Sequence, residues 1–475
     1  MGPIARLRRY SALPVFIGLA AASVGVIYGY DLSNIAGALL FIERDFGLSE
    51  PQQELITTAT VLGEIAGAVA AGWLANALGR KRSMVIVAVG YTAFSLLGAA
   101  STSVTSLTVA RLLLGVTIGV SVVVVPVFVA ESAPASVRGG LLVTYGVATV
   151  VGIIAGYLGA YLLSASGNWR AMLGLAAAPA VVTTCVLARL PDTPRWYLLK
   201  GRADEALRTL RRIEPDADAQ WELAEINRTL DAEQAGGVGV LREMVRPPYL
   251  RATLFVVTLG FFIQITGINA IVYYSPRLFQ KMGFDGYFAL LVLPALVQAA
   301  ALAAMAIAMA VIDRVGRRPI LLCGIAAMVV ADAMLVAAFA AGEVFGDALA
   351  VVEVGGVLLF TVGYTFGFGS LVWVYAGEAL PARMRSMGAS AMLTSDLVAN
   401  AMVAAVFLSM LSALGGAGTF AVLGLLAASS MAFVYRYAPE TKGRRLEDIR
   451  HFWENGGSWP ADTPEAPSTK ASACH

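Results

Sequence analysis

Residues 105–130 read TSLTVARLLLGVTIGVSVVVVPVFVA, a continuous apolar run in which Arg111 is the single charged side chain. About 20 apolar residues in one α-helix are enough to cross the hydrocarbon core of a bilayer. Lipid supplies no water to the backbone, and a helix satisfies its own N–H and C=O groups within the segment. The run therefore predicts a membrane-spanning helix.

Similar apolar runs lie on both sides of this one, separated by charged or turn-rich breaks. The chain has 475 residues, 58% hydrophobic and 14% charged, which is too little charge to cover the surface of a soluble protein. Long unbroken runs also exclude a β-barrel, whose strands would alternate over short segments. We predict an all-α integral membrane protein of about twelve helices, with the remaining spans at 13–41, 52–78, 83–101, 139–164, 169–190, 251–276, 287–312, 319–341, 347–377, 386–412 and 415–437.

Basic residues gather in alternate loops between these runs, whereas the other loops carry acidic residues. The basic positions are Arg6, Arg8, Arg9, Arg80–Arg82, Arg138, the stretch 195–251, Arg314, Arg317, Arg318 and the tail from Lys442. By the positive-inside rule we expect a multi-pass plasma-membrane protein with both termini cytoplasmic. Because these charges lie between spans rather than in one run, no nucleic-acid partner is expected. The first run is too long for a signal peptide and contains Asp31, so it is expected to be an uncleaved helix.

The polar segment 191–250 divides the apolar runs into two sets of six. We predict an N-terminal six-helix bundle at 1–190, a cytoplasmic linker with short amphipathic helices at 202–213 and 218–232, a C-terminal bundle at 251–437 and a cytoplasmic tail at 438–475. Two motifs recur at corresponding places: Gly79-Arg80-Lys81-Arg82 against Asp313-Arg314-Val315-Gly316-Arg317-Arg318, and Glu131-x6-Arg138 against Glu378-x6-Arg385. Pseudo-symmetric parallel halves with a midplane substrate site are how the major facilitator fold is built.

Further motifs follow one another in an order and spacing that resembles the sugar porter family of the major facilitator superfamily. The resemblance covers nearly the whole chain and implies sugar or polyol transport by alternating access, as in bacterial proton-coupled symporters. The motifs that carry it are Gly29-Tyr30-Asp31, Gly72-x6-Gly79-Arg80-Lys81, Arg111-x3-Gly115-x3-Gly119, Pro126-x-Phe128-x2-Glu131, Pro191-Asp192-Thr193-Pro194-Arg195-Trp196, Gln264-x2-Gly267-Ile268-Asn269, Tyr273-Tyr274-Ser275-Pro276 and Pro439-Glu440-Thr441-Lys442-Gly443.

Arginines and acids at the cytoplasmic ends of the spans predict a salt-bridge network. A guanidinium can form fork-like pairs with a carboxylate, and such pairs would hold helices together when the cytoplasmic side is closed and break when it opens. The alternative is that these residues are ordinary positive-inside anchors. Asn76 stands where the family has an acid, so the first-half network is expected to be weaker or to use another partner. The candidates are Arg80, Glu131, Arg138, Arg195, Asp313, Arg317, Glu378 and Arg385.

Ionisable residues inside spans are costly and are candidates for proton coupling. Both histidines, His451 and His475, lie in the tail, which excludes a histidine relay in the membrane. Asp31 and Arg111 match the aspartate and arginine of proton-coupled sugar porters; the arginine would keep the carboxylate ionised, and its departure would let the buried acid take a proton. A permanent structural ion pair is the alternative. Glu64 is a second proton site, a substrate contact or a partner of Arg111, whereas Asp332 is expected to be structural.

Amide and aromatic side chains are the expected substrate contacts, because amides offer both donors and an acceptor to ring hydroxyls. By the resemblance, Gln264, Asn269, Trp373 and Asn400 match the family's pattern. Four of its amide positions are replaced here, by Ile263, Gly146, Ala301 and Asp396, which leaves the compound open and makes a cyclic polyol or an amino sugar credible. The further candidates are Tyr273, Tyr274, Gln298 and Asp396 itself.

We therefore predict a proton-coupled symporter of a sugar or polyol that works as a monomer, with substrate, protons and lipid as its partners. A facilitative uniporter, a proton-coupled carrier of a non-sugar solute such as an organic cation, and a membrane sensor that has kept the fold remain open. No nucleophile–base constellation, metal cluster or phosphate-binding loop is visible, so no enzyme activity, cofactor or metal is expected. The three cysteines predict neither a disulfide framework nor a metal site.

Overall fold

The computed structural model describes residues 13–214, 218–236, 240–380, 384–444 and 446–459. Within these residues every regular element is a helix, and twelve helical segments are long and apolar enough to cross a membrane. The all-α prediction is thus confirmed. The observed spans begin and end within a few residues of the predicted ones, and the last predicted span, 415–437, coincides with its helix.

Each half of the chain supplies six spans, several of them made of two helical pieces. The first half contains α2 (Leu13–Phe46), α3 (Glu50–Leu78), α4 (Arg80–Ala99), α5 (Val104–Ser132), α6 (Ala135–Ser164), α7 (Trp169–Leu175) and α8 (Ala177–Ala188). The second half contains α13 (Leu250–Ile265), α14 (Ile268–Lys281), η1 (Phe288–Val292), α15 (Leu293–Val315), α16 (Arg317–Ala340), α17 (Gly342–Phe345), η2 (Gly346–Ala348), α18 (Leu349–Tyr364), η3 (Thr365–Gly369), α19 (Ser370–Ala379), α20 (Arg385–Ala404), α21 (Phe407–Ala413) and α22 (Gly415–Tyr437).

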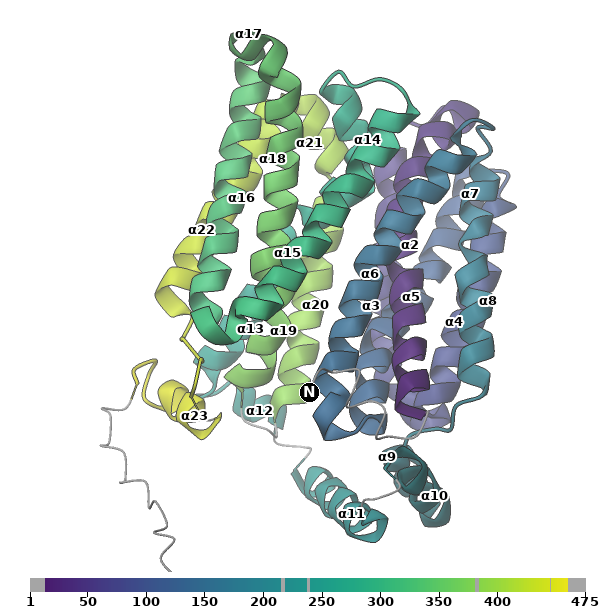
Figure 1. Cartoon of the computed structure of the whole chain (residues 1–475), viewed down its shortest axis with the longest axis vertical. Coiled ribbons are helices and arrows are strands. Elements are labelled where there is room, and N and C mark those ends of the chain that lie inside the picture. Colours follow the sequence, from purple (N-terminus) through teal and green to yellow (C-terminus); the bar gives the residue numbers. More distant parts are fainter. Residues whose placement is uncertain (1–12, 215–217, 237–239, 381–383, 445, 460–475) are drawn as a thin grey trace, which may run out of the picture.

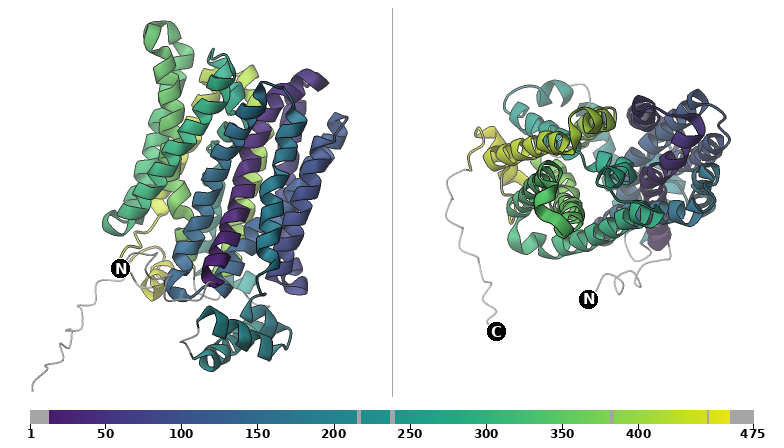
Figure 2. Two further views of the ribbon diagram at one scale, coloured as in Figure 1. Left: turned by 45° about the vertical axis from the view of Figure 1, so that its right-hand side comes forward. Right: turned by 90° about the horizontal axis from the view of Figure 1, so that it is seen from above.

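Short helices between and after the halves lie outside the spans. They are α9 (Pro194–Leu199), α10 (Ala203–Ile213), α11 (Ala219–Gly236), α12 (Val240–Met244) and α23 (Leu446–Glu454). Figures 1 and 2 show the first half (purple to blue) beside the second half (teal through green to yellow), with α9–α11 beyond one end of the spans. We call this end the linker end and the opposite end, where α17 lies, the distal end.

The first half is built from two closely packed helix pairs: α2 packs mainly on α6, and α3 mainly on α5. Glycines bring the backbones of α3 and α5 into direct contact. A Cβ on Gly115 would lie 1.9 Å from the Thr60 carbonyl oxygen, and one on Gly119 would lie 2.0 Å from that of Glu64. Such small-residue contacts are typical of helix packing in lipid, where close approach of backbones supplies the association energy.

In the described part of the chain, polar contacts join the two halves toward the distal end. The Tyr157 hydroxyl on α6 donates to the Val272 carbonyl on α14 at 2.6 Å. Arg277 on α14 forms an ion pair with Glu43 on α2. Ser409 on α21 donates to Glu54 on α3. These contacts hold the halves against each other at the distal end.

Breaks inside the spans were missing from the sequence-based boundaries. Between α13 and α14 the break lies at Gly267, whose φ of 98° is a left-handed conformation that glycine adopts without steric cost. A second break separates α20, which ends at Ala404, from α21, which begins at Phe407. Non-helical backbone at membrane depth is tolerated where protein covers it.

Candidate functional site

A buried ion pair joins α2 to α5 in the first half. Arg111 Nη1 lies 2.5 Å from Asp31 Oδ1, and each residue is only 3% exposed. Nη1 donates the hydrogen bond to the carboxylate, whereas the buried Nε of Arg111 has no hydrogen-bond partner. Pairing is the usual way in which charges are kept inside a membrane protein. The two residues that the sequence singled out are therefore in direct contact.

Glu64 on α3 is a third ionisable residue in the same region. It is 1% exposed, and neither carboxylate oxygen has a hydrogen-bond partner. Its charged neighbours are Asp31, Arg111 and Asp396. Asp396 belongs to α20, so the charged neighbours of Glu64 come from both halves of the chain. An unpaired acid in this position is rare and needs a chemical explanation.

Two candidate substrate contacts of the second half meet at Asp396. This residue is 7% exposed and is an electrostatic neighbour of the Gln264 side chain, which lies just before the break at Gly267. The buried Oε1 of Gln264 has no partner, so one acceptor is free. Asn269 lies just after the break and is partly buried. The break thus places an amide on each side of it.

The neighbouring tyrosines of α14, Tyr273 and Tyr274, make different contacts. Asn400 on α20 donates through Nδ2 to the Tyr273 hydroxyl at 3.3 Å, and Tyr273 is an electrostatic neighbour of Glu64. Tyr274 instead donates its hydroxyl to the Ala404 carbonyl at 2.9 Å and stacks on Phe407, with 5.7 Å between ring centroids. Tyr274 therefore supports the break between α20 and α21.

The remaining substrate candidates and the replaced amides lie on four helices. Gln298 is buried on α15, and Trp373 lies on α19 with its side chain outside the described part of the structure. Ile263 on α13 and Ala301 on α15 are buried. A Cβ on Gly146 of α6 would lie 3.1 Å from the Met305 side chain of α15, so the small residue lets the two halves approach each other.

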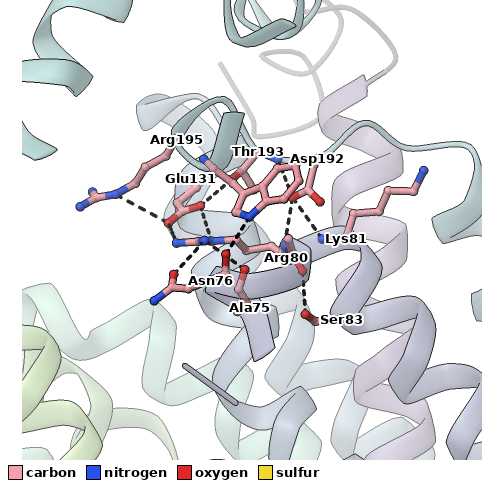
Figure 3. Close-up of polar contacts among 11 residues, drawn as sticks. Ala75, Asn76, Arg80, Lys81, Ser83, Glu131, Asp192, Thr193 and Arg195 are labelled. Atoms are coloured by element: carbon pink, nitrogen blue, oxygen red, sulfur yellow. Dashed lines mark hydrogen bonds and ion pairs between the residues drawn. The ribbon is translucent and has the colours of Figure 1, made fainter. Parts of the chain in front are cut away.

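The first-half salt-bridge network is shown in Figure 3. Arg80 holds Glu131 through Nε at 2.9 Å and Nη2 at 3.0 Å, and its Nη1 donates to Asn76 Oδ1 at 3.1 Å. Arg195 approaches the same carboxylate at 3.8 Å, and the Thr193 hydroxyl donates to it at 2.6 Å. Asn76 therefore still accepts from Arg80, while Glu131 is the main charged partner.

The second-half network is looser. Arg317 Nη1 lies 3.1 Å from Asp313 Oδ1, whereas its Nη2 is 3.9 Å from Glu378 Oε1. The buried Nε of Arg385 has no hydrogen-bond partner, and Arg138 donates to the Ala133 carbonyl rather than to a carboxylate. In both halves the observed ion pairs join helices of the same half.

Asp192 at the linker end belongs to a motif quoted for the family resemblance, but the sequence reasoning gave it no role. Its Oδ1 accepts the backbone N–H groups of Arg80 at 2.9 Å and Lys81 at 3.3 Å, at the start of α4 (Figure 3). The free N–H groups and the dipole at a helix start both favour a carboxylate there. Gly79 has a φ of 104°, and a Cβ on it would lie 2.1 Å from Asp192 Oδ2.

Glu440 repeats this arrangement in the second half. It accepts the backbone N–H groups of Arg317 and Arg318, both at 3.1 Å, at the start of α16. Gly316, with a φ of 110°, takes the place of Gly79. The signal was present in the sequence, because Pro-Asp-Thr at 191–193 and Pro-Glu-Thr at 439–441 follow the last span of each half.

The family comparison fits this doubled architecture. The family model described as "Sugar (and other) transporter" matches residues 17–453, which is nearly the whole chain. This chain belongs to the sugar porter family of the major facilitator superfamily. As a sugar porter it is a membrane transporter and not an enzyme.

Curated relatives of this sugar porter include two from Escherichia coli strain K12. The galactose-proton symporter is 34% identical over 443 residues, covering 93% of this chain and 95% of the relative. The arabinose-proton symporter is 34% identical over 448 residues, covering 93% and 94% respectively. A plant relative, polyol transporter 5 of Arabidopsis thaliana, is 28% identical over 475 residues, covering 94% of this chain and 88% of its own.

Solved structures confirm the fold of this sugar porter. The xylose transporter of E. coli in a partially occluded inward-open conformation superposes with a TM-score of 0.79 at 23% identity, covering 92% of this chain and all of that one. The inward-open conformation of the same transporter gives a TM-score of 0.79 at 24% identity, covering 93% of this chain and all of that one. The twelve-span major facilitator fold is thereby established for this multi-pass membrane protein.

Proposed function

We propose that this sugar porter takes up a sugar or polyol together with protons across the plasma membrane by alternating access. The observation that carries the proposal is the buried Asp31–Arg111 pair, which links α2 to α5 at 2.5 Å. Galactose-proton and arabinose-proton symporters among its relatives support the coupling ion and the substrate class.

Proton coupling follows from the chemistry of this pair. Arg111 stabilises the ionised form of Asp31, whereas a buried carboxylate without a cation favours its neutral form. Asp31 is carried by the α2–α6 pair and Arg111 by the α3–α5 pair, so relative movement of the two helix pairs changes their separation. Substrate binding drives transport when it favours one of the two arrangements.

The proposed substrate site lies between the two halves, and the residues proposed to line it belong to the second half. Gln264, Asn269 and Gln298 supply amides, the Tyr273–Asn400 pair supplies a hydroxyl and a donor, and Asp396 adds an acceptor for ring hydroxyls. Trp373 is proposed as the aromatic wall of the site. Tyr274 is reassigned as a support of the α20–α21 break, since its hydroxyl is engaged by Ala404.

The orientation and domain division belong to the same proposal. We place both termini and the linker end in the cytoplasm, with bundles at 1–190 and 251–437 that rock against each other in a monomer while the α2–α6 and α3–α5 pairs shift within the first bundle. Contacts between the halves at the distal end then correspond to an inward-facing state. The Arg80–Glu131 and Arg317–Glu378 networks would stiffen the cytoplasmic end of each bundle rather than lock the two bundles together.

Uptake in proteoliposomes tests this function. Galactose, arabinose, xylose, glucose and myo-inositol would each be measured with and without an inward proton gradient, beside the Asp31→Asn variant. The wild type is expected to accumulate at least one compound above equilibrium, and Asp31→Asn is expected to exchange that compound without accumulating it. Equilibration without accumulation by the wild type would indicate a uniporter, and no movement of any compound would redirect the search to non-sugar solutes.

A further inference from the structure

We propose that Glu64 is a second proton-carrying residue, which receives the proton from Asp31 as Arg111 moves from Glu64 to Asp31. This inference rests on the proton-coupled transport proposed above and adds a second acid to its pathway. Each carboxylate would pair with Arg111 in turn, and the one left without the arginine would hold the proton. The structure shows the stage at which Arg111 pairs with Asp31.

The first support is the isolation of the Glu64 side chain. Both of its oxygens are buried and unpartnered, whereas an ionised carboxylate out of water needs a cation or hydrogen-bond donors. Its tyrosine neighbours are Tyr28, Tyr145 and Tyr273, and its charged neighbours are Asp31, Arg111 and Asp396. In this arrangement the neutral, proton-bearing form of Glu64 is the one that the surroundings tolerate.

The second support is the unused capacity of Arg111. A guanidinium has five N–H donors in a rigid fork and can hold two carboxylates in turn or together. In this structure the hydrogen bond to Asp31 uses Nη1, while the buried Nε lacks a partner. Glu64 and Arg111 are electrostatic neighbours. Arg111 Nε is thus a donor without an acceptor, and its neighbour Glu64 has two carboxylate oxygens without a donor.

The third support is how the helices are paired. Glu64 and Arg111 both belong to the α3–α5 pair, whose backbones touch at Gly115 and Gly119. Asp31 belongs to the α2–α6 pair, where a Cβ on Gly29 would lie 1.8 Å from the Thr149 carbonyl oxygen. When the two pairs shift against each other, Asp31 moves away from Arg111 while Glu64 stays with it.

The transfer balances in charge and in atoms. The O–H bond of protonated Asp31 breaks and an O–H bond to a Glu64 oxygen forms, while Arg111 remains a cation and exchanges one carboxylate for the other. The Glu64 backbone packs against Gly119 of α5. Gly119 lies nearer to the linker end of α5 than Arg111 does. Glu64 is thus the acid from which the proton leaves to water on the linker side.

Asp332 provides a matched control for the experiment. It is equally buried, and both of its oxygens lack a partner, but it faces Gly424 of α22 from α16, outside the group formed by Asp31, Arg111 and Glu64. Glu64→Gln, Glu64→Asp, Asp31→Asn and Asp332→Asn would be compared with the wild type in proteoliposomes. The probe is whichever of galactose, arabinose, xylose, glucose or myo-inositol the wild type accumulates.

We expect Glu64→Gln to exchange the probe across equal concentrations but to lose accumulation, as Asp31→Asn does. Glu64→Asp should recover part of the accumulation, and Asp332→Asn should retain all of it. Full accumulation by Glu64→Gln would overturn the inference while leaving proton-coupled transport intact. If the wild type accumulates none of the probes, the proposed function itself fails, which is a separate outcome.

Infrared spectra of the purified protein keep the inference testable if Glu64→Gln does not transport. The wild type is expected to show a carboxylic-acid C=O band at neutral pH that is absent from Glu64→Gln and present in Asp332→Asn. Spectra in which Glu64→Gln retains every carboxylic-acid band of the wild type would overturn the inference, because Glu64 would then be ionised in the resting protein.

Discussion

Glu54 on α3 accepts the backbone N–H of Ser409 at 2.7 Å and the Ser409 hydroxyl at 2.6 Å, so a carboxylate of the first half holds the first turn of α21 in the second. The two residues are 355 positions apart in the chain. Glu54 is buried, and a carboxylate at a helix start meets both free N–H groups and the favourable end of the helix dipole. This contact closes the distal end.

Removing the Glu54 carboxylate should favour opening of the distal end. Glu54→Ala leaves the Ser409 N–H without its acceptor, which costs the closed arrangement about 1–3 kcal/mol. Spin labels at Arg44, exposed in the last turn of α2, and at Asp285, exposed in the loop after α14, would report a longer distance in the variant. An unchanged distance distribution would show that Glu54 does not stabilise the closed end.

The labelling needs two controls. Glu50→Ala changes a partly exposed acid one turn earlier on α3 and should leave the distance unchanged. The labels would be introduced in a background without Cys185, Cys323 and Cys474, because the first two are exposed thiols that would react as well.

Asp192 and Glu440 should stabilise their halves by similar amounts. Asp192→Ala removes the acceptor of two backbone N–H groups at the start of α4, and Glu440→Ala does the same at α16. Loss of a helix cap costs about 0.5–2 kcal/mol, so both variants should have a lower Tm in detergent. Asp204→Ala, at an exposed acid of α10, should not change Tm.

Gly79 and Gly316 should not tolerate a side chain. Gly79→Ala forces a Cβ into a left-handed backbone and against the Asp192 carboxylate, which costs at least about 1–3 kcal/mol of strain. Gly316→Ala meets Glu440 in the same way. Both should reduce the yield of folded protein in size-exclusion chromatography. Gly72→Ala is the control, since a Cβ there has open space, and equal yields of all three would refute the strain argument.

The two linker-end networks should respond unequally to loss of their acid. Glu131→Gln weakens contacts to Arg80, Arg195 and Thr193, whereas Glu378→Gln affects the 3.9 Å contact to Arg317. A partly buried, hydrogen-bonded charge contributes about 1.5–3 kcal/mol, and a long contact far less. Thermal unfolding of the two variants would check this, and an equal or larger loss in Glu378→Gln would contradict it.

Much of the site was visible in the sequence because a charge inside an apolar run is exceptional. Asp31, Arg111 and Glu64 stood out for that reason, and the structure places all three in one buried group. Arg80 with Glu131 followed from a repeated motif. Arg138 and Arg385 followed from the same motif, but Arg138 donates to a carbonyl, and Arg385 has a buried Nε without a partner.

Other contacts could not be read from the chain. Glu54 looks like an ordinary loop-side acid until α21 is placed against α3, and Ser409 carries no sequence signal at all. The break between Ala404 and Phe407 lies in an apolar stretch without proline or glycine. Tyr274 resembled a substrate contact because it neighbours Tyr273, yet its hydroxyl is engaged by the Ala404 carbonyl.

The sequence by itself determined the number, order and limits of the spans, the two-fold repeat and the family. These are local properties, because a bilayer selects helices by the length and hydropathy of each segment and not by its neighbours. Only the tertiary structure decided which carboxylate pairs with Arg111 and at which end the halves meet. It also decided which carboxylates accept the free N–H groups at the starts of α4, α16 and α21. Those pairings depend on how each helix is rotated and how deep it lies relative to its neighbours. Close backbone contacts, such as the one between Gly119 and the Glu64 carbonyl, determine that rotation and depth.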